Sequence, residues 1–107
     1  FPTRRSSDLG ELAIVFANAL ENAIHACMEL PQAQRQIRCK AVGIPSIMLE
    51  ISNPCPGMIE FDSNGLPIAR RKGHGQGIQS ICAFCQTHGA VCHFEINKGW
   101  FQFRMVL

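Results

Sequence analysis

The sequence of 107 residues has no long apolar run, no strong charge of one sign and no repeated or low-complexity segment. A bilayer-spanning helix needs about 18 or more consecutive apolar residues. No stretch reaches that length, so we expect no membrane-spanning segment within these residues. The formal net charge is +2, and the only basic run is residues 70–72. Nucleic-acid binding usually needs a basic face, so this charge pattern argues against it.

The length allows one domain with a hydrophobic core of its own. Residues 1–9, FPTRRSSDL, resemble the translation of a sequencing adapter, so we exclude them from fold prediction and assign the domain to residues 10–107. Because the chain begins at Phe1, we expect it to be a fragment of a longer protein.

Six cysteines, at positions 27, 39, 55, 82, 85 and 92, leave several interpretations open. A secreted chain would use them as a disulfide framework, and Cys82-x-x-Cys85 followed by Cys92 and His93 would suit zinc. Packing is the simpler explanation, because Cys27 lies in an apolar helical pattern and Cys82 and Cys85 share the core face of another. We therefore favour reduced thiols over a disulfide, a zinc site or a redox CxxC motif.

Residues 11–30 predict a long helix that is buried on most sides. At about 100° per residue its polar side chains fall within one arc. This polar stripe consists of Glu11, Asn18, Asn22, His25 and Glu29. An unpaired buried amide costs roughly 1–3 kcal/mol, so Asn18 and Asn22 need a polar partner. That partner is either a nearby loop or a bound ligand.

The run KGHGQGI at residues 72–78 offers a site for such a ligand. Three glycines at alternate positions let the backbone approach a ligand closely, and the following helix offers unpaired N–H groups and a positive dipole end. These properties predict a phosphate-binding turn. The helical spacing of Ile78, Ile81, Cys82 and Cys85 predicts an amphipathic helix over residues 76–88 that is capped by Gly89.

Period-two alternation predicts four strands. The first two are antiparallel neighbours that are half-buried, and the last two are joined by a hairpin turn. Their ranges are 37–41, 47–52, 90–96 and 101–107, with the hairpin turn at 97–99. His88 and His93, near the third strand, are expected at the surface.

The segment between the second strand and the second helix predicts a loop. The two prolines of NPCPG at residues 53–57 are expected to end the sheet pattern. A turn at residues 62–65 follows, within a lid over residues 58–72. The order helix, two strands, lid, helix, two strands predicts an α/β sandwich, with helices on one face of a mixed, mainly antiparallel sheet.

Two motifs together resemble the ATP-binding catalytic domain of sensor histidine kinases, in the superfamily of gyrase, mismatch-repair and chaperone ATPases. NALENAIHAC at residues 18–27 is similar to the Asn box, and GHGQGIQSI at residues 73–81 to the second glycine box. GLP at residues 65–67 resembles the lid of the accessory-gene-regulator type of quorum-sensing kinase. The resemblance covers residues 11–107 and implies a Bergerat-type two-layer sandwich that binds ATP and Mg²⁺.

The resemblance also implies roles for residues of the Asn box. Asn22 matches the Mg²⁺ ligand, and Asn18 would face the same phosphates; an amide oxygen is a suitable hard ligand. Hydrolysing relatives carry a Glu at position 18, and an Asn cannot replace it as a general base, so the chain resembles a phosphoryl-transfer enzyme. Glu21 either activates the acceptor histidine or is an outward-facing carboxylate.

The two glycine boxes would bind the rest of the nucleotide. Asn53 aligns with the Asp that recognises adenine, and Gly57 is the one glycine kept from that box. Because a charge-assisted hydrogen bond is roughly twice as strong as a neutral one, we expect weaker nucleotide binding. His74 would either bond a phosphate or pack against the lid. The second-box contacts implied by the resemblance are Lys72, Gly73, His74, Gly75, Gly77 and Ile78.

The resemblance implies transfer of the γ-phosphoryl group to a His on a dimerisation segment that lies before residue 11 and is missing here. The implied partners are a response regulator and, in the full-length protein, a second copy. The missing region would hold the membrane anchor, which would place this domain on the cytoplasmic side of the inner membrane. Two alternatives stay open: a serine kinase of the anti-sigma type, and a non-catalytic pseudokinase that serves as an interaction module.

Overall fold

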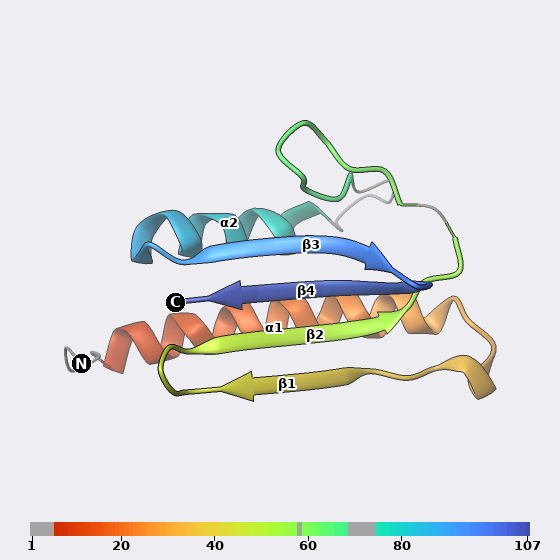
Figure 1. The fold of residues 1–107 in the computed structure, drawn as a ribbon, viewed down its shortest axis with the longest axis horizontal. Helices are drawn as coiled ribbons and strands as arrows, with labels where there is room; N and C mark the ends of the chain where they lie inside the picture. The colour runs from red at the N-terminus through yellow and green to blue at the C-terminus, as the bar shows by residue number, and fades with distance from the viewer. Residues whose placement is uncertain (1–5, 58, 69–74) are drawn as a thin grey trace.

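The computed structural model describes residues 6–57, 59–68 and 75–107. Two helices cover one face of a four-stranded sheet (Figure 1), whose strand order is β1-β2-β4-β3. All three strand pairings are antiparallel. The elements are α1 (Ser6–Met28), a short 3₁₀ helix η1 (Gln32–Gln34), β1 (Arg38–Val42), β2 (Met48–Pro54), α2 (Gly75–His88), β3 (Val91–Asn97) and β4 (Trp100–Val106). The predicted two-layer α/β sandwich is confirmed.

The core lies between the sheet and the two helices. Ile81 of α2 and Met105 of β4 are fully buried at its centre. Phe94 and Phe103 lie on neighbouring strands, and the centroids of their rings are 5.2 Å apart. Both rings belong to the sheet side of the core, beneath the helices. No helix among the described ranges is both long enough and apolar enough to cross a membrane.

Helix α1 is buried along one face only. Its buried side chains recur every fourth residue, at Val15, Ala19, Ala23 and Cys27. On the other side Met28 is 64% exposed. The prediction of burial on most sides is therefore wrong, because the sheet and α2, which make the main contacts with α1 in the described part of the chain, cover only one of its faces.

Strand β1 is exposed along its whole length, so the prediction of a half-buried first strand is wrong. It nevertheless pairs with β2 in the predicted antiparallel direction, and the register places Cys39 opposite Ile51. Figure 1 shows α1 behind β2 and β4, with β1 beyond the helix at the edge of the sheet. The alternating pattern predicted the strand correctly but not how far the helices reach across the sheet.

Strand β2 is longer than predicted and includes the first proline of NPCPG. The N–H of Cys55 donates to the carbonyl oxygen of Gly99 at 2.7 Å. Because partners alternate along an antiparallel ladder, the nitrogen of Pro54 then faces away from β4, toward β1. On that side β1 pairs only as far as Ser52. Pro54 thus removes no hydrogen bond from the ladder, and the strand ends within the NPCPG run, at its first proline, two residues beyond the predicted end.

The turn before β3 and the turn between β3 and β4 are as predicted. Gly89 follows α2 with φ +68°, and the N–H of Ala90 donates to the carbonyl oxygen of Cys85 at 3.0 Å, which is a Schellman-type cap. Lys98 and Gly99 both have positive φ, as a type I′ hairpin turn requires. The second helix and its C-terminal cap are confirmed.

The predicted turn at residues 62–65 is present in the loop above α2 (Figure 1). The Asp62 carboxylate accepts hydrogen bonds from the backbone N–H groups of Asn64 and Leu66, at 2.8 and 3.0 Å. Phe61 and Pro67 form an isolated bridge across the loop. Phe61 and Leu66 also pack against the core, which anchors this part of the predicted lid.

Candidate functional site

Helices α1 and α2 pack side by side in opposite directions, so that the end of one meets the beginning of the other. Glu11, early in α1, contacts His88, the last residue of α2. Asn22, later in α1, faces Gly77 near the start of α2. The interface therefore has two ends. We call Asn18, Asn22 and Gly77 the amide end, and Glu11, Val15, Phe84 and His88 the apolar end.

At the amide end the start of α2 faces the asparagine side chains, with no side chain of its own at Gly77 to fill the space between them. A Cβ atom placed on Gly77 would lie 3.5 Å from both Oδ1 and Nδ2 of Asn22, and 3.8 Å from Cβ of Asn18. Both asparagines are half-buried. The structure thus brings together the two motifs that the sequence separates by about 50 residues.

The electrostatics at this end favour an anion. The first turn of α2 contains no acidic residue, so nothing there neutralises the positive end of the helix dipole. The first backbone N–H groups of a helix also have no partner within the helix. A phosphate next to Gly75 and Gly77 could accept hydrogen bonds from these N–H groups and would be stabilised by the positive end of the helix dipole.

The donor set also fits Mg²⁺ held jointly with phosphates. The Asn22 side chain offers a hard oxygen ligand close to the helix N-terminus, and Mg²⁺ keeps several waters when one or two protein oxygens bind it. Among the residues that the structure describes, no group of three or more His, Cys, Asp or Glu side chains is arranged to hold a metal ion. A cation at the amide end would therefore need ligands from the nucleotide as well as from Asn22.

Part of the predicted second glycine box cannot be placed. Lys72, Gly73 and His74 lie outside the described residues. Gly75 begins α2, and the Ile78 side chain is half-buried against the core cluster.

Asn53 lies on the same face of β2 as the buried Leu49 and Ile51, and only 2% of its surface is exposed. Its Nδ2 donates to the carbonyl oxygen of Pro54 at 3.1 Å. Gly57, further along, is exposed, and a Cβ atom placed on it would meet no atom within 4 Å, so the described chain does not itself demand a glycine there. The adenine-binding roles of both residues stay predictions.

Glu21 points into solvent. Its side chain is 65% exposed and lies 3.8 Å from the imidazole of His25, one turn along α1. This position matches the outward-facing alternative, and a role in activating an acceptor histidine stays a prediction.

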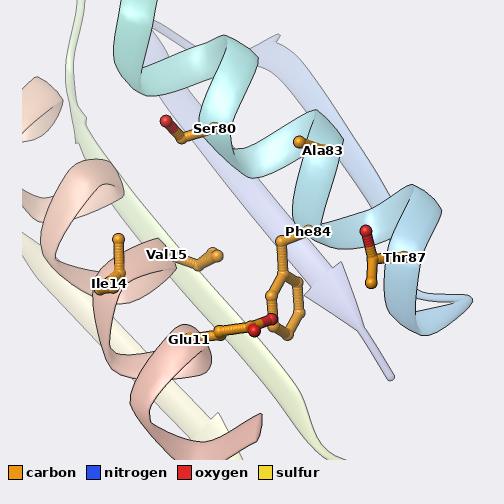
Figure 2. A pocket seen from close by; sticks show the side chains of 7 residues that line it. All are labelled: Glu11, Ile14, Val15, Ser80, Ala83, Phe84 and Thr87. Atoms are coloured by element: carbon orange, nitrogen blue, oxygen red, sulfur yellow. The ribbon is translucent and has the colours of Figure 1, made fainter. Parts of the chain in front are cut away.

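The apolar end is a shallow groove of about 200 Å³ between the two helices (Figure 2). Ile14 and Val15 of α1 and Ala83 and Phe84 of α2 form most of its wall. None of the predicted site residues lines it. With a mainly apolar wall, it is a poor match for a triphosphate.

Sequence reasoning missed the contact that closes this groove. The Glu11 carboxylate and His88 Nε2 lie 2.5 Å apart, and the His88 ring lies over that of Phe84 at 4.4 Å between centroids. The His88 side chain is only 16% exposed, so the prediction of a surface position is wrong. Glu11 and His88 are 77 residues apart, and no local pattern could have paired them.

The fold and the amide end together define an α/β sandwich with a candidate anion site between its two helices. A family model described as the GHKL domain matches residues 8–107. The chain therefore belongs to the GHKL domain family, and it is an ATP-binding domain of that family. Such domains are ATP-dependent kinases or ATPases and typically bind Mg²⁺ with ATP. No curated protein matches the chain.

Proposed function

We propose that this GHKL domain is the catalytic domain of a sensor histidine kinase of the quorum-sensing type. It binds Mg·ATP at the amide end and donates the γ-phosphoryl group to a histidine on a separate helical segment. The observation that carries the proposal is that the Asn22 amide lies beside Gly77, across the space that a side chain at position 77 would enter. This places an amide group near the N-terminal end of a helix whose first turn carries no acidic side chain.

The residues at the amide end have distinct roles in this proposal. Asn22 would hold the Mg²⁺ ion, which would supply positive charge to stabilise the phosphates. The backbone at Gly75 and Gly77 would orient the phosphates, together with Lys72, Gly73 and His74. Asn53 and Gly57 would face the adenine.

Position 18 supports transfer over hydrolysis. An Asn side chain cannot take a proton from water, so the amide end provides no general base at that position. Phosphoryl transfer depends mainly on positioning the acceptor. The isolated domain should therefore bind nucleotide but phosphorylate little until an acceptor segment is supplied. Its other proposed partners are a response regulator and a second copy, at the cytoplasmic face of the membrane.

Calorimetric titration with Mg·ATP tests the binding site. Asn22→Ala should weaken binding by about tenfold or more, because it removes the proposed metal ligand. Asn97→Ala is the matched control, since it removes the same amide group from the exposed end of β3 and should leave affinity unchanged. Equal affinity in wild type and Asn22→Ala would refute the proposed site.

The acceptor distinguishes the proposal from the serine-kinase and pseudokinase alternatives. The full-length protein should carry label from γ-labelled ATP on a histidine, as a phosphoryl group that is lost in acid and kept in base. Acid-stable label on a serine would favour the serine kinase. Absence of saturable binding up to millimolar ATP would favour the non-catalytic module.

A further inference from the structure

Strand β1 is one edge of the sheet. The strand order is β1-β2-β4-β3, so among the strands that the structure describes β1 pairs with β2 alone. All five of its residues, Arg38–Val42, are exposed. An unpaired edge offers backbone N–H and C=O groups to an extended chain from another molecule.

The backbone groups of β1 that face outward belong to Cys39 and Ala41. Odd-numbered residues of β2 bond to β4, as the hydrogen bonds that flank this pair of strands show. Because bonding alternates along an antiparallel ladder, even-numbered residues of β2 then bond to β1. Their partners in the register are Arg38, Lys40 and Val42. Cys39 and Ala41, between these three, direct their N–H and C=O groups away from the sheet.

The side chains of Arg38 and Lys40 place two cations on the face of the sheet that is turned away from the helices. Glu50 lies opposite Lys40, but its two carboxylate oxygens already accept hydrogen bonds from Gln102 and Arg104. Opposite charges on neighbouring strands stabilise a sheet and like charges destabilise it. An added strand with carboxylates on this face would therefore complement β1.

The other face of β1 carries two small side chains. Cys39 and Ala41 lie opposite buried residues of β2, yet they are exposed because α1 does not extend over β1 (Figure 1). At about 100° per residue, Ile24 lies on the side of α1 opposite Asn22, which faces α2. Ile24 is 43% exposed. Apolar side chains of an added strand would cover Cys39 and Ala41 on this face, on the Ile24 side of α1.

We propose that β1 binds an extended segment of a partner protein in which acidic and apolar side chains alternate. The segment adds a strand to the four-stranded sheet, with its backbone bonded to Cys39 and Ala41 and its carboxylates beside Arg38 and Lys40. A second copy of this chain is a poor occupant, because antiparallel pairing of β1 with itself about Lys40 sets two lysines opposite each other. The surface lies on the side of α1 away from α2, so the proposal does not depend on the nucleotide site.

Two labelled probe peptides, titrated with the whole chain without nucleotide, test the proposed chemistry. One alternates glutamate and valine over about seven residues, a common strand length, and the other alternates lysine and valine. Fluorescence anisotropy should show saturable binding of the glutamate probe alone, with an affinity that falls as salt is added. Bound probe should also slow hydrogen exchange at the Cys39 and Ala41 amides. Equal binding of both probes, or binding of neither, would overturn the proposal.

Ala41→Pro tests whether the backbone edge is the binding surface. The substitution removes an outward N–H and leaves the hydrogen bonds between β1 and β2 in place. It should weaken binding of the glutamate probe by about tenfold or more. Ala41→Val is the matched control, since it keeps the N–H and suits a strand, and its affinity should stay within about twofold of wild type. Wild-type affinity in Ala41→Pro would place the peptide elsewhere and refute the proposal.

Lys40→Glu tests the charge without changing the backbone. Lys40 is the cation to reverse, because the Arg38 guanidinium is held 4.0 Å from the centre of the Trp100 ring. The reversal should weaken the glutamate probe by about threefold to tenfold and strengthen the lysine probe by a similar factor. Lys98→Glu makes the same charge change in the exposed turn between β3 and β4 and should leave the preference unchanged.

Two results with these variants would contradict the proposal. Equal effects of Lys40→Glu and Lys98→Glu would show that the probe responds only to net charge. A dimer of the chain itself that sedimentation detects and Ala41→Pro abolishes would assign the β1 edge to a second copy instead.

Discussion

The two ends of the α1–α2 interface differ in the kind of side chain that they contain: one end is mainly apolar and the other is polar. At the apolar end, the buried side chains of Val15 and Phe84 lie beside a shallow apolar groove, and Glu11 contacts His88. At the amide end, the second helix contributes Gly77, which has no side chain, and the first contributes polar amides. The same pair of helices thus places packing at one end and accessible polar groups at the other. If this division is real, substitutions at the two ends should affect stability and nucleotide binding separately.

The largest effect on stability is expected from Phe84→Ala at the apolar end. Phe84 is 6% exposed and stacks with His88, so truncation should lower the free energy of unfolding by about 3–5 kcal/mol. Urea denaturation measures the change. Thr87→Ala, an exposed position on the same groove, should change stability by less than about 0.5 kcal/mol. A similar loss in both variants would mean that the apolar end does not carry the packing.

A smaller effect is expected from Asn53→Asp, which tests how much the buried amide contributes to the stability of the fold. The change removes the donor that bonds the Pro54 carbonyl and places a carboxyl where 2% of the surface is exposed. The free energy of unfolding should fall by about 1–3 kcal/mol at pH 7.

The pH dependence of Asn53→Asp has a definite sign. Burial should hold the pKa of the new carboxyl above its unfolded value. The folded state then binds more protons, so the loss should be small near pH 4 and should grow as pH rises through the folded-state pKa. Urea denaturation of the variant and of wild type at pH 4 and at pH 7 measures how the loss of unfolding free energy changes with pH. A loss that is constant with pH would show that the carboxyl is not buried.

The elements that sequence periodicity predicted well are those whose partners are local. The second helix, its Gly89 cap and the Lys98 and Gly99 turn all follow from neighbouring residues. The exposure of β1 and the pairing of Glu11 with His88 depend on where distant elements come to lie, which local spacing does not encode.

The candidate site was predictable to a similar extent. Its two motifs were recognisable separately, and the expectation that they meet rested on a resemblance. The extension of β2 through Pro54 was hidden because the effect of a proline depends on which side of the strand its nitrogen faces.

The smallest change in stability is expected from Gly77→Ala. This variant also tests most directly whether the amide end serves binding and the apolar end serves stability. The new Cβ would lie 3.5 Å from the Asn22 amide, which is ordinary contact, and Gly77 lies within α2. Replacing a helical glycine by alanine contributes up to about 1 kcal/mol of helix propensity, so the free energy of unfolding should stay the same or rise slightly. Nucleotide affinity should nevertheless fall, because the methyl group occupies the space between the helix backbone and Asn22 where phosphate would approach. Thermal denaturation and Mg·ATP calorimetry on one preparation separate these two effects. Unchanged affinity would show that the glycine serves only the close packing of the two helices, whereas a more stable variant that binds ATP poorly would locate the ligand at the amide end.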